Sequence, residues 1–346
     1  MIRIPRRVIQ MLPKAVQVHF NEYNELRYDQ IQYTAAAKQA LSRYNRPDSE
    51  DLFRAWFADF KKYRVSFPEY LEQYRFPERS EAEKAAYMTA SVMRSIYRRK
   101  VDAKSRQRFL NKERFLEDYS EYIHREWLHV KPDSDASQIQ QFLNRFDVIV
   151  KPLNGTHGQG VRKLPKGANP ITEGLLGQEL MMEQCVSGEA TLQAFHPQSL
   201  NTIRIAMFTD GKSEVRTMWA VLRTGNNHSC IDNTHGGGIS SLIDVNTGTI
   251  ISDGQCDGKI YEKHPVSAIP FKGFRIPYWE DIIRICKEAA VKYENTYFVG
   301  WDVAVWDDGR IEFIEGNHGP DVDGVQTLLN HGLKPEILKT IKELHI

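Results

Sequence analysis

Apolar residues recur three and four positions apart through the first part of the chain, a spacing that gives a helix one apolar face. Residues 49–63 and 80–99 show it most clearly, and both segments are rich in Ala, Glu, Arg and Lys, which favour helices. The Val/Ile runs and glycine turns of a parallel sheet are missing from this part. We therefore predict an all-helical region over residues 1–105.

The pattern changes after residue 146, where short apolar or alternating runs replace the helical spacing. Such runs predict strands, which we place at residues 147–151, 161–164, 200–208, 214–222, 239–251, 299–306 and 311–315. Residues 278–293 and 333–344 again carry the spacing of amphipathic helices. Because strands and helices do not alternate regularly, the pattern favours α+β lobes over a doubly wound parallel sheet.

Composition is that of an ordinary globular protein, with 41% hydrophobic and 26% charged residues among 346. No apolar run reaches the roughly 18 residues of a membrane span, and no secretory h-region follows the N-terminus. The scattered cysteines, Cys185, Cys230, Cys256 and Cys286, form no C-x-x-C pair, which indicates reduced thiols rather than a zinc site. We expect a cytoplasmic protein with no nucleic-acid ligand.

The net charge of +1 is unevenly spread along the chain. Residues 1–130 hold 25 Lys and Arg against 18 Asp and Glu, whereas the remaining residues hold 21 against 27. The opening segment, residues 2–20, is basic and amphipathic. Three interpretations stay open for it: an ordinary docking helix, peripheral contact with an anionic inner membrane surface, and contact with an acidic partner or a glycosyltransferase.

A predicted hairpin near the C-terminal end carries the strongest chemical signal. Its turn at residues 307–309 (Asp-Asp-Gly) would bring Asp302 on the first strand alongside Glu315 on the second. Glu315 and Asn317 are two residues apart, so their side chains project from the same face of the strand. Two carboxylates and an amide oxygen are hard ligands of the kind that hold Mg²⁺ together with substrate phosphates. The hairpin therefore predicts a magnesium site.

A glycine-rich loop follows the strand that ends in Lys151. Gly155, Gly158 and Gly160 allow backbone N–H groups to turn inward around phosphate oxygens, and Lys151 supplies a positive charge beside them. The loop is not a Walker motif, because no Lys follows the last glycine. It is not a dinucleotide fingerprint either, because a strand rather than a helix follows it. The loop predicts phosphate binding, with an ordinary hairpin loop as the alternative.

Together, the two motifs resemble the nucleotide site of the ATP-grasp superfamily, which includes D-alanine–D-alanine ligase and other carboxylate–amine ligases. The runs HPQSLNTIRI, DNTHGGG, HPVSAIPFKGFRIPYW and VGWDVAVWDDGRIEFIEGN are similar to the bacterial branch called sugar-transfer-associated ATP-grasp proteins, and the resemblance covers roughly residues 105–330. It implies an ATP-grasp fold in which a small lobe with the glycine loop, residues 106–184, and a large lobe with the metal site, residues 185–346, clasp ATP. The implied cofactors are ATP and Mg²⁺, which we expect as two ions.

The resemblance also implies residue roles in the small lobe and at the metal site. Lys112 and Lys151 match the two nucleotide lysines, and residues 155–160 match a flexible phosphate lid. The matched metal ligands are Asp302, Glu315 and Asn317.

A second group of implied roles lies around residues 181–186, which match the hinge between the lobes. Backbone groups of Gln184 and Cys185 would read adenine, with Glu183 on its amino group. Glu189 would hold the ribose hydroxyls, although its spacing from the hinge is shorter than in the D-alanine ligase pattern.

One departure from the family pattern concerns the arginine that D-alanine ligases place two residues before the metal Asp. Gly300 occupies that position here. We expect Arg204 to supply the missing cation, because its neighbours Ile203 and Ile205 indicate that it faces away from a core. Asn201 would lie near it as a second catalytic residue.

A third loop of interest is the run of three glycines at residues 236–238. Its backbone N–H groups could cradle a substrate carboxylate, or the loop could simply connect two strands. His235, His264 and His318 lie in or beside the motifs, and no base role is assigned to them.

The resemblance implies an ATP- and Mg²⁺-dependent carboxylate–amine ligase that acts through an acyl phosphate in bacterial polysaccharide or cell-surface glycan biosynthesis. Its substrates would be a small carboxylate and an amine, with a sugar-linked substrate left open. Two alternatives remain: a phosphotransferase acting on a sugar or other small-molecule hydroxyl, and a non-catalytic nucleotide-binding partner of a glycosyltransferase.

Overall fold

The computed structural model describes residues 14–44, 48–153, 160–226 and 237–346. The chain divides into two compact units, Met1–Arg99 with Asp321–Glu336, and Lys100–Pro320 with Ile337–Ile346. In this division residues 321–336 group with the N-terminal helices. The predicted boundaries at residues 105 and 184 stay predictions.

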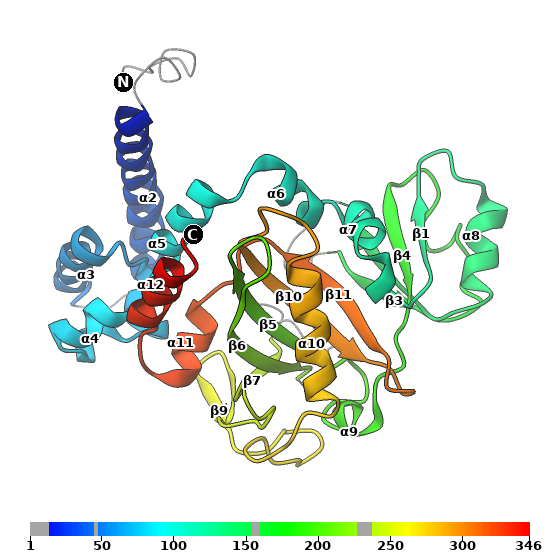
Figure 1. Ribbon diagram of the computed structural model, residues 1–346. Coiled ribbons are helices and arrows are strands. Elements are labelled where there is room, and N and C mark those ends of the chain that lie inside the picture. The colour runs from blue at the N-terminus through cyan, green and yellow to red at the C-terminus, as the bar shows by residue number, and fades with distance from the viewer. Residues whose placement is uncertain (1–13, 45–47, 154–159, 227–236) are drawn as a thin grey trace. The chain divides into compact units, whose positions relative to one another are not determined.

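All the regular elements of the first unit among its described residues are helices, as predicted, and they are coloured blue to cyan and red in Figure 1. They are α2 (Lys14–Tyr44), α3 (Ser49–Tyr63), α4 (Glu81–Ala86), α5 (Ala90–Lys100) and α11 (Asp323–Leu329), with short turns at Glu69–Gln73 and Phe76–Glu78. Its core is rich in aromatic side chains, among them Trp56, Tyr74 and Phe76, all fully buried. The predicted single helical stretch at residues 80–99 is two helices, because the chain is extended at residues 87–89.

Helix α11 is held in this unit by a buried glutamine. The side-chain amide of Gln326 donates to the backbone oxygen of Met88 at 2.9 Å and to the hydroxyl of Tyr74 at 3.0 Å, and its oxygen accepts from the backbone N–H of Met88 at 2.9 Å. Buried amide groups of this kind are satisfied by specific partners. The sequence alone offers no signal for a pairing 238 residues apart.

The second unit contains two sheets, of which the smaller is coloured teal to green and the larger green to orange in Figure 1. The smaller sheet has the order β1-β4-β2-β3, with β1 (Trp127–Val130), β4 (Leu180–Gln184), β2 (Val148–Pro152) and β3 (Arg162–Leu164), all antiparallel. The short helices α6 (Ala103–Leu110) and α7 (Lys112–Asp118) precede it, and α8 (Ala136–Leu143) packs on it through Ile139, Phe142 and Leu143.

The larger sheet is antiparallel and has the order β11-β10-β5-β6-β7-β8-β9. Its strands are β5 (Thr202–Thr209), β6 (Val215–Thr224), β7 (Ile239–Ile243), β8 (Gly254–Cys256), β9 (Lys259–Tyr261), β10 (Phe298–Val305) and β11 (Ile311–Asn317). Helices α9 (Ala190–Gln193) and α10 (Trp279–Ala290) belong to this unit, while α12 (Lys334–Glu343) begins in the first unit and continues in the second. The predicted α+β organisation is confirmed.

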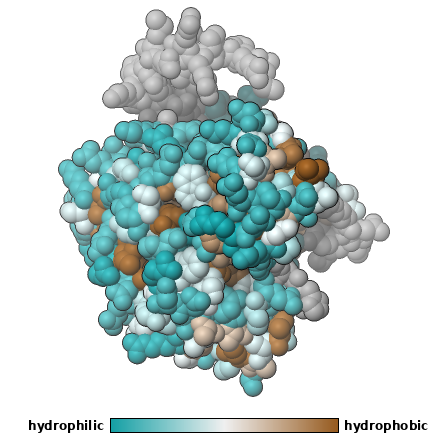
Figure 2. Space-filling model, turned by 90° about the vertical axis from the view of Figure 1, so that its right-hand side faces the viewer, coloured by the Kyte–Doolittle hydropathy of each residue, from teal (hydrophilic) through white to brown (hydrophobic). Residues whose placement is uncertain are grey.

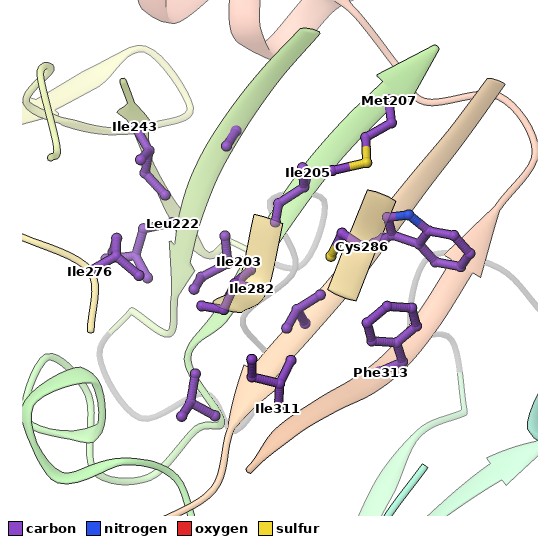
Figure 3. Packing of buried hydrophobic residues seen from close by; sticks show 14 of the residues in the cluster. Ile203, Ile205, Met207, Leu222, Ile243, Ile276, Ile282, Cys286, Ile311 and Phe313 are labelled. Atoms are coloured by element: carbon purple, nitrogen blue, oxygen red, sulfur yellow. The ribbon is translucent and has the colours of Figure 1, made fainter. Parts of the chain in front are cut away.

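The two faces of the large sheet differ in character because strand residues alternate between faces. Ile203, Ile205 and Trp301 are fully buried, and Figure 3 shows Ile203 and Ile205 on the side of the sheet where Ile282 and Cys286 of α10 lie. Burying such side chains contributes about 1.5–3 kcal/mol each. The residues between them in sequence therefore project from the opposite face, which carries the chemistry described below.

The face in Figure 2 is mostly hydrophilic, with hydrophobic residues in small separate groups. Within the described residues, none of the helices combines the length and apolar character needed to cross a membrane. The first part of the basic opening segment lies outside the described residues, so its predicted membrane or protein contact stays a prediction.

Candidate active site

The three predicted metal ligands meet on the face of the large sheet opposite α10. Asp302 on β10 is the direct partner of Glu315 on β11, and Gly300 is the partner of Asn317. Side chains of directly paired residues point to the same side of a sheet. The register shifts between Asp302 and Val303, and this bulge or irregularity sets Asp302 opposite Glu315 instead of Ile314. The predicted hairpin and this register shift together bring Asp302, Glu315 and Asn317 to one side of the sheet.

Asn317 provides the observation that fits a cation. Its side-chain oxygen Oδ1 is buried and accepts no hydrogen bond from any described residue. A buried oxygen in that state is costly unless a partner is supplied from outside the chain. Two adjacent carboxylates and this oxygen match the oxygen-rich coordination of Mg²⁺. In the described part of the chain, no three His, Cys, Asp or Glu side chains cluster as a metal site, so two carboxylates and the Asn317 amide are the side-chain ligands that this position could offer.

Gly300 is explained by the same pairing. A Cβ atom added at residue 300 would lie 2.7 Å from Oδ1 of Asn317, closer than real Cβ contacts. Any side chain at this position would displace Asn317. The arginine that D-alanine ligases carry there has no room in this chain.

Arg204 lies beside the predicted metal ligands on a neighbouring strand, and its role as the missing cation stays a prediction. It lies on β5 directly opposite Asp302, and its Nε and Nη2 donate to the two oxygens of that carboxylate. A second arginine, Arg223 on β6, places Nη1 3.7 Å from Oδ2 of Asp302. Burial alone would raise the pKa of Asp302, but the two guanidinium groups outweigh it and hold the pKa below its usual range.

Glu315 experiences the opposite shift. Surrounding protein raises the pKa of its carboxyl group, and the Asp302 carboxylate raises it further, while Lys151 and Arg204 act in the other direction. Because the Glu315 side chain is exposed, water screens part of the burial effect. The adjacent carboxylate is the cause that the strand pairing supports directly. A cation between the two carboxylates would relieve their repulsion.

Two predicted nucleotide lysines approach this cluster from the small lobe. Lys151 ends the regular part of β2, and its Nζ lies 2.8 Å from Oε2 of Glu183 on β4. Lys112, at the start of α7, places Nζ 3.5 Å from the backbone oxygen of Leu153. Burial lowers the pKa of Lys112, and Lys151 lowers it further, whereas the Glu315 carboxylate acts to raise it. The two lysines and Glu315 thus influence one another electrostatically.

Only the end of the predicted glycine loop can be described. Gly155 and Gly158 lie outside the described residues, so their roles stay predictions. Gly160 has a φ of 73°, and a Cβ there would lie 2.9 Å from Cγ of Pro152. Both features require glycine where the chain enters β3.

At the predicted hinge, the side chain of Glu183 and two backbone groups already have partners. Glu183 accepts hydrogen bonds from Lys151 and Arg125. The backbone N–H of Gln184 donates to the backbone oxygen of Glu126, and that of Cys185 donates to the backbone oxygen of Asp147. Because both N–H groups already have acceptors, the predicted adenine contact would have to use other groups of Gln184 and Cys185.

The other two predicted residues near the hinge have local partners. Glu189 caps α9, because its carboxylate accepts from the backbone N–H groups of Thr191 and Leu192. Asn201 is buried and donates to the backbone oxygens of Leu192 and His196 at 3.0 and 3.2 Å. These contacts favour a structural role for Asn201. The predicted ribose contact of Glu189 stays a prediction.

The triple-glycine loop lies partly outside the described residues, with His235 and Gly236. Gly237 is described, and its backbone oxygen lies 3.3 Å from Sγ of Cys256. His264 is buried, with Nε2 2.9 Å from the backbone oxygen of Gly225, and burial lowers its pKa. Burial likewise lowers the pKa of His318.

Sequence reasoning missed three residues near the site: Arg125, Arg223 and Glu312. Arg223 lies one residue beyond the predicted strand end at residue 222, whereas β6 runs to Thr224. Extending the two-residue alternation of the predicted strand would have placed Arg223 on the same face as Val221. Arg125 precedes β1, a strand of four residues that was not predicted. Glu312 is fully buried on β11 and pairs with Arg125. No local pattern reveals a pairing of this kind.

Similar solved structures are remote. One is the ATP-grasp ligase PsnB complexed with a phosphomimetic variant of minimal precursor, Mg and ADP, with 12% identity, 74% of this chain and 67% of that chain covered, and a TM-score of 0.45. Another is an ADP complex of the N5-carboxyaminoimidazole ribonucleotide synthetase purK, with 14% identity, coverages of 63% and 47%, and a TM-score of 0.41. A third is an L-amino acid ligase from Bacillus licheniformis, with 10% identity, coverages of 68% and 48%, and a TM-score of 0.41. A search of curated proteins gave no match.

The family comparison is direct. The family model described as sugar-transfer associated ATP-grasp matches residues 171–343, half of the chain. The matched range includes the hinge, both arginines and all three predicted metal ligands, whereas Lys112 and Lys151 lie before it. The resemblance inferred from the motifs is confirmed, and with it the ATP-grasp fold. This chain belongs to the sugar-transfer-associated ATP-grasp family.

Proposed function

We propose that this protein is an ATP- and Mg²⁺-dependent ligase that joins a carboxylate to an amine through an acyl phosphate. The observation that carries the proposal is the polar face of the large sheet. There, two carboxylates and an unpartnered amide oxygen lie beside the guanidinium groups of Arg204 and Arg223. The family description supports a substrate in polysaccharide or cell-surface glycan biosynthesis. A cytoplasmic location fits such a role and belongs to the same proposal.

The groups on this face and the two lysines of the small lobe each have a task in the proposed reaction. Lys112 and Lys151 bind nucleotide phosphates as point charges. Asp302, Glu315 and Asn317 would hold Mg²⁺, which offsets the negative charge of the β- and γ-phosphates when bound.

The first step forms the acyl phosphate. A carboxylate oxygen of the acid substrate attacks the γ-phosphorus, the bond from that phosphorus to the β,γ-bridging oxygen breaks, and ADP leaves. Arg204 and Arg223 lie next to the metal ligand Asp302, from where they would stabilise the negative charge of the transferring phosphoryl group. Preorganised donors of this kind stabilise a transition state without reorganising. In the second step, the amine nitrogen attacks the acyl carbon, inorganic phosphate leaves and the nitrogen loses a proton.

Hydroxylamine distinguishes this reaction from its alternatives. When the acid substrate is supplied with ATP and Mg²⁺ but without its amine, we expect hydroxylamine to trap the acyl phosphate as a hydroxamate. Panels of uronic acids and amino acids serve as candidate acids, and the Glu315→Gln variant is the control that should give no product. A phosphorylated sugar alcohol in place of any hydroxamate would favour the phosphotransferase. Nucleotide binding without turnover of either kind would favour a non-catalytic partner.

Loss of the Lys151 ammonium should weaken nucleotide binding. We expect Lys151→Ala to reduce the ATP binding free energy by about 1–3 kcal/mol, the range of a charge-assisted hydrogen bond, and Lys112→Ala to act in the same direction. Isothermal titration calorimetry with ATP measures both. The matched control is Lys163→Ala on the adjacent strand β3, which should leave the affinity unchanged. Lys163 is exposed, and its Nζ lies 4.0 Å from Oδ2 of Asp147, the outer limit of an ion pair. If neither Lys151→Ala nor Lys112→Ala changes the affinity, the lysine assignment is wrong.

A further inference from the structure

Arg125 is a buried arginine that bonds to both sheets of the second unit. Its side chain is 2% exposed. The guanidinium Nε donates to Glu183 at 2.7 Å, and Nη1 donates to Glu312. Further bonds run from Nη1 to the backbone oxygen of Phe313 at 2.7 Å and from Nη2 to that of Ile314 at 3.1 Å. Few arginines use so many donors at once, and each bond restricts where the side chain can lie.

The two carboxylates that meet Arg125 come from different sheets. Glu183 lies on β4 of the small sheet, whereas Glu312 lies on β11 of the large one. Glu312 is fully buried, and it also accepts a hydrogen bond from Nε1 of Trp306 at 2.8 Å. Strand β11 continues from Glu312 to the predicted metal ligands Glu315 and Asn317. Arg125 therefore ties the small sheet to the strand that carries the metal ligands.

Glu183 extends this chain of contacts to Lys151. The same carboxylate oxygen, Oε2, accepts from Arg125 at 2.7 Å and from Lys151 at 2.8 Å. Two cations and two carboxylates alternate along the path from Glu312 to Lys151, so the buried charges compensate one another. Burial would raise the pKa of Glu183, but Arg125 and Lys151 lower it to about 2. Glu183 is therefore ionised at neutral pH and holds the Lys151 ammonium by a charge-assisted bond.

We propose that Arg125 is a positioning residue: acting through Glu183, it fixes the Lys151 ammonium relative to strand β11 and its metal ligands. The proposal rests on the proposed function, because it takes Lys151 as a phosphate ligand. It assigns the Glu183 side chain to holding Lys151 instead of reading the adenine amino group. Supporting groups of this kind change ligand affinity without touching the ligand.

The first test compares nucleotide affinity with stability. We expect Arg125→Lys to raise the dissociation constant of ADP about tenfold to a hundredfold, the scale seen when an outer-shell partner is lost. Titration calorimetry measures the affinity, and thermal unfolding without nucleotide measures stability. Arg108→Lys is the matched control, because Arg108 is equally buried and also forms an ion pair, here between its Nε and Oδ2 of Asp118 at 2.8 Å. This pair does not involve Lys151. Arg108→Lys should lower the unfolding temperature but leave ADP binding unchanged.

A mutant cycle separates positioning from simple stabilisation. In the Lys151→Ala background there is no ammonium to position, so adding Arg125→Lys should cause no further loss of ADP affinity, although the loss of stability persists. Equal losses of affinity in both backgrounds would overturn the proposal. If Arg125→Lys does not fold, Glu183→Gln takes its place in the cycle, because it keeps the shape of the side chain and removes its charge.

Inosine triphosphate tests the role of Glu183, since its base lacks the amino group of adenine. If Glu183 holds Lys151, Glu183→Gln should weaken the binding of ATP and of inosine triphosphate by the same factor. A loss confined to ATP would show that Glu183 reads the base and would overturn the proposal. Unaltered protein that binds neither ADP nor ATP would overturn the proposed function itself. Normal ADP binding by both Arg125→Lys and Glu183→Gln would overturn this inference alone.

Discussion

Replacing Glu315 with Gln is expected to abolish ATP turnover while the protein stays folded. The exchange removes the charge of one of the two paired carboxylates, and with it much of the attraction for a divalent cation. Charge stabilisation by a metal ion is worth several kcal/mol in a phosphoryl transfer, and each 1.36 kcal/mol is tenfold in rate. We therefore expect turnover to fall by about a thousandfold or more. Stability should hardly change, because the Glu315 side chain is exposed.

The measurement is Mg²⁺-dependent release of ADP, with circular dichroism as the check on folding. Asp308→Asn is the matched control, because Asp308 is an exposed carboxylate in the turn of the same hairpin and pairs with Arg310. It should turn over ATP as the unaltered protein does. Turnover at the unaltered rate in Glu315→Gln would show that the metal assignment is wrong.

Asp302→Asn should abolish turnover as well, but it is the less clean variant. Asp302 is buried and compensates the charge of Arg204 and of Arg223. Removing its charge leaves two guanidinium groups facing each other, so a loss of stability is expected along with the loss of activity.

Removing the guanidinium of Arg204 is expected to reduce turnover by roughly two to three orders of magnitude, with little change in ATP affinity. That is the typical cost of losing one preorganised donor that acts in the transition state. Steady-state kinetics and calorimetry on Arg204→Ala measure the two effects separately. The turnover of Arg204→Lys should lie between that of the unaltered protein and that of Arg204→Ala, because lysine keeps a cation beside Asp302 but cannot form the bidentate pair.

A control variant and a separate measurement of ATP affinity show whether slow turnover in Arg204→Ala reflects a lost catalytic group. The control is Arg216→Ala, because Arg216 lies in the same sheet on β6, is exposed, and pairs with Glu214. It should leave kinetics unchanged. Weakened ATP binding in Arg204→Ala with an unchanged turnover number would instead place Arg204 among the nucleotide ligands.

Much of the large sheet was readable in the sequence because its strands obey a two-residue period. Predicted strands at residues 299–306 and 311–315 correspond to β10 and β11, and the turn at residues 307–309 joins them. The turn alone pairs Val303 with Phe313 and would set Asp302 opposite Ile314, so the pairing of Asp302 with Glu315 depends on the register shift after Asp302, which the sequence did not predict. Likewise, the prediction for residues 49–63 matches α3, whose apolar spacing is regular.

Elements with weak local patterns were missed. Strand β1 has four residues, and its burial is partial along three of them, so no alternation stands out. The break between α4 and α5 at residues 87–89 carries no Pro or Gly to signal it. Its extended backbone is held by tertiary bonds instead, such as that from the Thr89 hydroxyl to the backbone oxygen of Tyr63 at 3.1 Å.

By itself, the sequence determined which residues could supply oxygen ligands and positive charge, and that Glu315 and Asn317 share one strand face, because the two-residue period is a local property. Only the tertiary structure decided how the charges are shared. In it, Asp302 forms ion pairs with Arg204 and Arg223, and Glu183 forms ion pairs with Lys151 and Arg125. The partners in these pairs lie between 32 and 98 residues apart. Pairings over such separations depend on which strands lie side by side in each sheet and on how the segment before β1 packs, and no short stretch of sequence encodes that.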